Sequence, residues 1–131
     1  MSNQSLGQQG EDKAAEYLQK NGYKIIERNF TRRPWGEIDI VAQKNGMFGI
    51  IQGRIIFVEV KSIVKRKDFF PEDQITPKKE KQLRKMARIY LSANKLPQDT
   101  PCQIDIIAIE FNKNGQIIAL RHLQNALEDN Y

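Results

Sequence analysis

Hydrophobic and polar positions repeat along the chain with two different periods, which predict two helices and five strands. An apolar residue recurs every three or four positions in residues 4–21 and 76–94, the spacing of an amphipathic helix. We expect residues 121–131 to form a short helix and a polar tail. Segments rich in Ile, Val and Phe, with the short period of strands, are 23–30, 36–42, 55–61, 103–111 and 116–120.

Capping and turn residues mark where several of these elements begin and end. Asn21-Gly22 is a typical helix stop, and Thr76-Pro77 combines a capping hydroxyl with a proline suited to the first helical position. Asn112–Gly115 predicts a tight hairpin turn. The order helix, three strands, helix, two strands predicts a single α/β domain over residues 1–131. Its central mixed sheet would have about five strands flanked by helices.

The segment from Lys44 to Gly53 allows more than one interpretation. It contains three glycines and is too apolar for a simple turn. A flap, an extension of the hairpin and a dimer contact are all consistent with it, and the residues do not decide between them.

Charged residues stand inside the two most apolar strands. Asp39 lies within 36–42, and Glu59 and Lys61 share one face at the end of 55–61. Charges in apolar strands cost stability unless they pair, form hydrogen bonds or hold a metal. These three residues are therefore the first candidates for a functional site.

Glu11 is a further candidate, because it lies on the apolar face of the first helix. A helix that crosses the sheet near the second and third strands would bring Glu11, Asp39 and Glu59 together. Three carboxylates repel one another unless a proton or a cation neutralises them, and Mg²⁺ or Mn²⁺ prefers such oxygen ligands. Lys61 would then orient or deprotonate a water and stabilise charge on a phosphate, which is metal-assisted phosphodiester hydrolysis.

The composition excludes several other classes of protein. The chain has a single cysteine, Cys102, which rules out an intrachain disulfide. One cysteine and one histidine also argue against a zinc site. No run reaches the ~20 apolar residues of a membrane helix, and the polar first residues lack the plan of a signal peptide. We therefore expect a cytoplasmic protein that does not enter a membrane.

The positive charge is concentrated in one part of the chain. The net charge is +5, and residues 54–95 hold twelve Lys and Arg against five Asp and Glu. A clustered basic surface beside buried acids indicates a polyanionic partner, with nucleic acid the leading candidate. The candidate phosphate contacts, each with a solvated surface as its alternative, are Arg32, Arg33, Lys65, Arg66, Lys78 and Lys81.

The motifs together resemble those of a known superfamily. An acid on one strand followed by an acid-x-Lys on the next is similar to the core motif of restriction-endonuclease-like proteins. More closely, the chain resembles the YraN family of bacterial proteins, which is related in pattern to archaeal Holliday-junction resolvases. The likeness spans nearly the whole chain and rests on Gly10-Glu11, Ala15, Leu18, Gly22-Tyr23, Asn29, Gly36–Asp39, Phe57–Lys61, Lys81, Ala87, Tyr90, Leu91 and Asp105.

The resemblance implies a restriction-endonuclease-like fold and a role for each matching residue. Asp39 and Glu59 would be the metal-binding acids, Lys61 the catalytic lysine, and Glu11 an additional acid. The Val60 carbonyl would be a further ligand. The implied substrate is DNA, branched or otherwise structured, and a two-fold substrate would favour a homodimer.

Two other functions remain open at this stage. A nucleic-acid-binding domain of nuclease ancestry would keep the basic helix without needing metal affinity at Asp39 and Glu59. A structural or interaction module would instead pair its buried acids with Lys61 and neighbouring residues.

Overall fold

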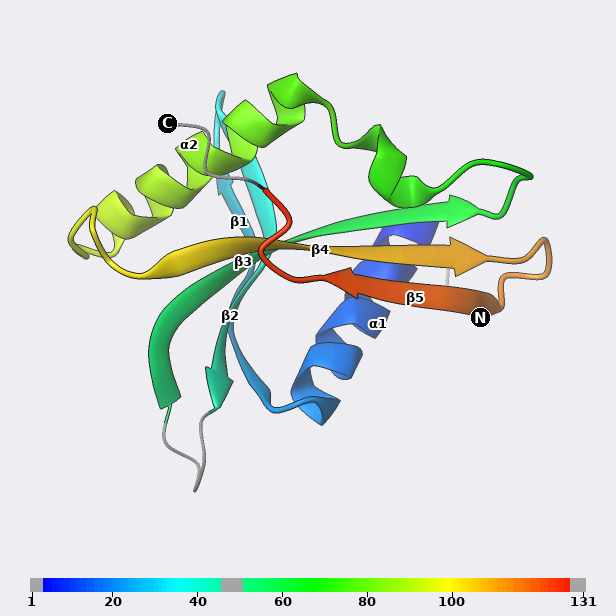
Figure 1. Cartoon of the computed structure of the whole chain (residues 1–131), viewed down its shortest axis with the longest axis horizontal. Coiled ribbons are helices and arrows are strands. Elements are labelled where there is room, and N and C mark those ends of the chain that lie inside the picture. The colour runs from blue at the N-terminus through cyan, green and yellow to red at the C-terminus, as the bar shows by residue number, and fades with distance from the viewer. Residues whose placement is uncertain (1–3, 46–50, 128–131) are drawn as a thin grey trace.

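The computed structural model describes residues 4–45 and 51–127, which form a sheet with one long helix on each face (Figure 1). Among these residues, no helix has the length and hydrophobicity that crossing a membrane requires. The elements in chain order are α1 (Leu6–Lys20), β1 (Tyr23–Arg32), β2 (Gly36–Asn45), β3 (Ile51–Val64), the short 3-10 helix η2 (Pro71–Gln74), α2 (Pro77–Ala93), β4 (Cys102–Phe111) and β5 (Ile117–Leu123).

The five strands follow one another across the sheet in chain order, β1-β2-β3-β4-β5. All neighbours are antiparallel except β3 and β4, which are parallel and are connected through η2 and α2. This arrangement confirms the predicted α/β fold with a mixed sheet of about five strands flanked by helices.

Each face of the sheet has its own hydrophobic core. The side that carries α2 buries Phe57, Met86 and Tyr90, and the side that carries α1 buries Leu18 and Ile107. Because strands β2, β3 and β4 contribute apolar side chains to both cores, they read in the sequence as nearly continuous hydrophobic runs. A charged side chain in the central part of these strands is therefore buried on either face, as Asp39, Glu59 and Asp105 are.

The capping predictions are confirmed at the helix ends and at one hairpin. Helix α1 is capped by Ser5 at its start and by Asn21 at its end, and Gly22 follows with a φ of 85°. The Thr76 hydroxyl accepts a hydrogen bond from the Lys79 amide at 3.1 Å, which caps α2. In the β4–β5 turn, Asn112 Oδ1 accepts hydrogen bonds from the amides of residues 114 and 116.

Two expectations about segments change with the structure. The short helix expected from Arg121 is wrong, because residues 121–123 continue β5 and pair with Ile106–Ala108 of β4. Residues 124 and 125 form a turn, and 128–131 lie outside the described residues. In the segment 44–53, β2 runs to Asn45 and β3 starts at Ile51, so both strands extend beyond the predicted ends. Residues 46–50 lie outside the described part.

Helix α1 lies close against strand β3 at Gly10. A β-carbon at this position would overlap the Ser62 hydroxyl and come within 3.1 Å of the Ser62 β-carbon. The Ser62 hydroxyl is buried and has no hydrogen-bond partner among the described residues. The absence of a side chain at Gly10 therefore sets how deeply α1 lies on the sheet, directly beside Glu11.

Replacing Gly10 by alanine should destabilise the protein by about 1–3 kcal/mol, because the added methyl group overpacks the contact with Ser62. The second substitution Ser62→Ala removes the overlapping hydroxyl and should recover most of this loss. Chemical denaturation of the two single variants and the double variant measures both effects.

Gly7→Ala is the matched control, since a β-carbon there meets only Ser5 Oγ at 3.9 Å. This exposed helical position should gain about 0.5–1 kcal/mol from the helix propensity of alanine. Equal stabilisation by both substitutions would contradict the close approach at Gly10.

Candidate functional site

Asp39 and Glu59 lie where strands β2 and β3 separate. The paired register of these strands ends at Ile40 with Val58, one residue before the two acids. Asp39 is 5% exposed and Glu59 is 4% exposed. The Asp39 carboxylate accepts a hydrogen bond from the Val60 amide at 2.7 Å, so its side chain satisfies a backbone donor of β3. The sequence prediction of two acids on adjacent strands thus corresponds to one buried pair.

Glu11 reaches the same pair from α1. Its carboxyl group shares a hydrogen bond with Asp39, and burial followed by the charge of Asp39 raises the pKa of Glu11 to about 7. The same bond favours the charged form of Asp39, although burial raises the pKa of Asp39 overall. The two carboxyl groups therefore form one hydrogen-bonded pair, and burial is the main reason that the pKa of each is raised.

Glu59 faces the amino-terminal turn of α2. Its Oε1 lies 3.5 Å from the Lys79 ammonium in an ion pair. Burial, followed by the nearby charge of Asp39, raises the pKa of Glu59 to about 7, while the charges of Lys79 and Lys61 lower it. Lys61, which the sequence predicts at the site, thus lowers the pKa of Glu59 through its charge, but Lys79 forms the ion pair.

Asp39 and Glu59 form a buried pair of carboxylates, and among the described residues no three His, Cys, Asp or Glu side chains form a group that could hold a metal. Mg²⁺ is usually bound by only one or two carboxylates, with waters and substrate phosphates completing its six ligands. Asp39 and Glu59 fit this kind of site. The backbone of Val60 also lies at this pair, because its amide donates a hydrogen bond to the Asp39 carboxylate.

The six candidate phosphate contacts fall into two groups. Arg32 and Arg33 are exposed at the β1–β2 turn, which contacts α2 through a hydrogen bond from Gln82 to the Trp35 carbonyl. Lys78 and Lys81 are exposed on that same helix. The second group follows β3, where it is partly engaged within the protein: Lys65 pairs with Glu110 at 3.4 Å, and the Arg66 guanidinium lies 4.6 Å from the Phe69 ring centroid.

Sequence reasoning did not assign Lys79 to the site. It placed this residue on the basic helix, but nothing in the sequence relates the first turn of α2 to Glu59, which is 20 positions earlier. The capping residue Thr76 is the sequence signal that could have located Lys79. It fixes the start of the helix and therefore the direction in which Lys79 points.

The network around His122 was also not predicted. His122 Nε2 lies 2.7 Å from buried Asp105, and its Nδ1 lies 3.0 Å from the Tyr17 hydroxyl. Asp105 also accepts hydrogen bonds from the Gln103 side chain and the Asn125 amide. The only histidine of the chain is therefore held within a hydrogen-bonded network between α1, β4 and β5.

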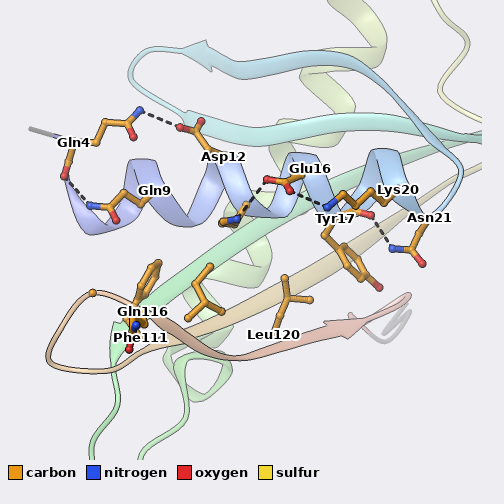
Figure 2. A pocket seen from close by; sticks show the side chains of 13 residues that line it. Gln4, Gln9, Asp12, Glu16, Tyr17, Lys20, Asn21, Phe111, Gln116 and Leu120 are labelled. Atoms are coloured by element: carbon orange, nitrogen blue, oxygen red, sulfur yellow. Dashed lines mark hydrogen bonds and ion pairs between the residues drawn. The ribbon is translucent and has the colours of Figure 1, made fainter. Parts of the chain in front are cut away.

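A groove of about 750 Å³ lies between α1 and the β4–β5 hairpin (Figure 2). Tyr17 and Lys20 line its helical side, and Phe111, Gln116 and Leu120 line the opposite side. Asp39, Glu59 and Lys61 are not among its lining residues. The buried acids therefore do not belong to this groove.

The fold and the site define a class: an α/β domain that carries a buried acid pair on adjacent strands beside two lysines. The sequence pattern of the uncharacterised protein family UPF0102 matches residues 10–109. The chain belongs to this family, which confirms the resemblance to YraN proteins.

Full-length relatives agree with this assignment. A UPF0102 protein of Desulforamulus reducens is 35% identical over 94% of this chain and 95% of its own. One from Lachnoclostridium phytofermentans is 41% identical over 76% and 77%, and one from Trichlorobacter lovleyi is 39% identical over 96% and 92%.

Among solved structures, Pyrococcus furiosus SfsA in complex with Ca²⁺ is similar over 89% of this chain and 63% of its own. The TM-score between the two structures is 0.40, and their sequences are 18% identical.

In the metal-free protein, Glu59 should make the stability fall as the pH rises. Its folded pKa of about 7 is above the ordinary 4.5, so the protonated acid stabilises the fold fully below pH 4.5. This contribution disappears as the pH passes through 7. Relative to Glu59→Gln, the wild type should lose about 1–3 kcal/mol between pH 5 and pH 8, measured by urea unfolding in a chelator.

Glu16→Gln is the control, because Glu16 is exposed and pairs only at the surface with Lys13 and Lys20. A difference between the wild type and Glu59→Gln that does not change with pH would refute the raised pKa.

Proposed function

We propose that the protein is a divalent-metal-dependent endonuclease that hydrolyses phosphodiester bonds in DNA. The observation that carries this proposal is the burial of Asp39 and Glu59 together at the point where β2 and β3 separate. Two carboxylates of raised pKa within one site form a costly arrangement unless a cation joins them. The same two positions are the acids of the restriction-endonuclease-like motif that the sequence resembles.

Each residue of the site has a defined task in this proposal. Bound Mg²⁺ or Mn²⁺ would supply Lewis-acid chemistry at the scissile phosphate. Asp39 and Glu59 would hold the ion, with Glu11 and the Val60 carbonyl as the further ligands that the resemblance implies. Lys61 would orient the attacking water and stabilise the charge that develops on the phosphate.

The substrate class follows from charge and from the resemblance to junction resolvases. The exposed cations of the β1–β2 turn and of α2 provide a basic surface that suits a phosphate backbone. Branched or otherwise structured DNA is proposed from the family resemblance. A homodimer on a two-fold junction would belong to the same proposal.

Two observations favour a second function, a nucleic-acid-binding domain that does not cut. Glu59 already has a cationic partner in Lys79. No three acidic, His or Cys side chains in the described ranges are gathered for a metal. In this alternative the acids would be structural, and the basic surface alone would act. Metal binding distinguishes the two functions.

Calorimetric titration of Mg²⁺ and Mn²⁺ should give binding heat in the wild type and none in Asp39→Asn/Glu59→Gln. Both substitutions keep the side-chain size and remove the charges that attract the cation. A short branched duplex should be present in a second series, because substrate phosphates complete the ligand shell. Glu16→Gln, which removes an exposed acid from α1, should bind metal as the wild type does. Acid-independent heats in both series would overturn the metal-dependent function and leave the binding domain.

Lys61→Met should lower the cleavage rate constant for branched DNA about 10²–10³-fold at saturating metal, while metal affinity is retained. The loss is expected because the lysine would act on the water and the phosphate rather than on the ion. Lys67→Met, which removes an exposed cation from the loop after β3, should cut at the wild-type rate. Equal rates for both variants would exclude Lys61 from catalysis.

A further inference from the structure

Trp35 stands at the tip of the β1–β2 turn with 46% of its surface exposed. It is the only tryptophan of the chain. Tryptophan is the largest apolar side chain, and burial of its ring would normally stabilise the fold. Tryptophan is also enriched at interfaces, so the exposed indole of Trp35 is available for contact with a partner.

The position of Trp35 is fixed by α2. The Gln82 side-chain amide donates a hydrogen bond to the Trp35 carbonyl at 2.9 Å, and the Trp35 amide donates to the Arg32 carbonyl at 2.9 Å. At Gly36 the backbone has a φ of 137°, and a β-carbon there would overlap the Gln82 side chain. The turn is thus seated on the helix that also supplies Lys79 to Glu59.

One cation lies at the indole ring, and two more are exposed in the same turn. The Lys85 ammonium lies 5.4 Å from the ring centroid. Arg32 and Arg33 are the exposed cations of the turn, and the Arg32 guanidinium lies 4.3 Å from the centroid of the Phe30 ring. Glu37, also exposed, is the nearest acid along β2. An aromatic face among cations is the combination by which proteins hold single-stranded nucleic acid, since bases stack on the ring while cations contact the backbone.

We propose that Trp35 is a stacking platform for an unpaired base of the DNA. The inference rests on the proposed function and narrows its substrate. Asp39 lies four residue steps after Trp35, with three residues of strand β2 between them, about 13 Å at the rise of a strand. This length equals roughly four base steps of 3.4 Å. The substrate is accordingly DNA in which base pairing ends within about four steps of the bond that is cut.

The single tryptophan makes this proposal measurable in the unmodified protein. In EDTA, which prevents cutting, Trp35 fluorescence is followed while two probes are added. One probe is a blunt 20-base-pair duplex, and the other is the same duplex with a single-stranded tail. The tailed duplex should quench the fluorescence, and the blunt duplex should leave it nearly unchanged.

Variants separate stacking from general attraction. Trp35→Ala should weaken binding of the tailed duplex roughly 5- to 150-fold, the range of one base–aromatic stack, and leave binding of the blunt duplex unchanged. Trp35→Phe should retain most of the affinity. Ile118→Ala, which truncates a side chain of β5 that is 48% exposed, should have no effect on either probe.

Three results would overturn the proposal: equal quenching by both probes, wild-type affinity of Trp35→Ala for the tailed duplex, or no binding of either probe. A change of oligomeric state in Trp35→Ala with unchanged DNA binding would also overturn it and assign the indole to a protein contact. Failure of the nuclease function looks different. In that case the tailed duplex still quenches Trp35, but no metal produces cleavage that depends on Asp39 and Glu59.

Discussion

The hydrogen bond from the Val60 amide to the Asp39 carboxylate is the interaction on which the site depends. It holds an acid in the space where two strands part, and it satisfies a backbone donor that would otherwise be buried without a partner. Once Asp39 is fixed, Glu11 can share a hydrogen bond with it, and Glu59 experiences its charge. Three elements distant in the sequence are thereby joined through a single carboxylate.

Glu110, a buried acid elsewhere in the molecule, differs from Asp39 and Glu59 because neighbouring cations compensate its charge. Glu110 is 1% exposed, yet Arg121 and Lys65 both pair with it, and Arg121 also pairs with Glu72 through two hydrogen bonds. These partners lower the pKa of Glu110, while the pKa of Asp39 and that of Glu59 are raised. Full compensation is typical of a structural ion pair, and incomplete compensation is typical of a functional site.

Much of the fold could be predicted because its elements follow local rules. The apolar periods locate both helices and all five strands, and Thr76 and Asn112 locate a helix start and a turn. The sequence pattern predicts that strand β5 ends at Leu120, which is too early. Residues 121–123 belong to the strand because they pair with β4, and their own apolar pattern does not indicate this.

Of the candidate site, Asp39, Glu59 and Glu11 were identified because acids are costly on apolar faces. The ion pair with Lys79 and the seating of Trp35 on Gln82 could not be predicted, because both depend on where α2 lies across the sheet. The network of His122 likewise depends on how α1 meets β4 and β5. Local sequence carries no signal for such distances.

The single parallel pair of strands has a consequence for synthesis on the ribosome. Strands β1, β2 and β3 are joined by short connections and can pair as soon as they emerge, bringing the two acids together early. The other edge of β3 must wait for β4, since Ile55 pairs with Cys102. During that interval the chain presents one of its most apolar strands with an open edge, a template for pairing with other chains. The order of translation thus exposes the strand of Glu59 to aggregation until the crossover is complete.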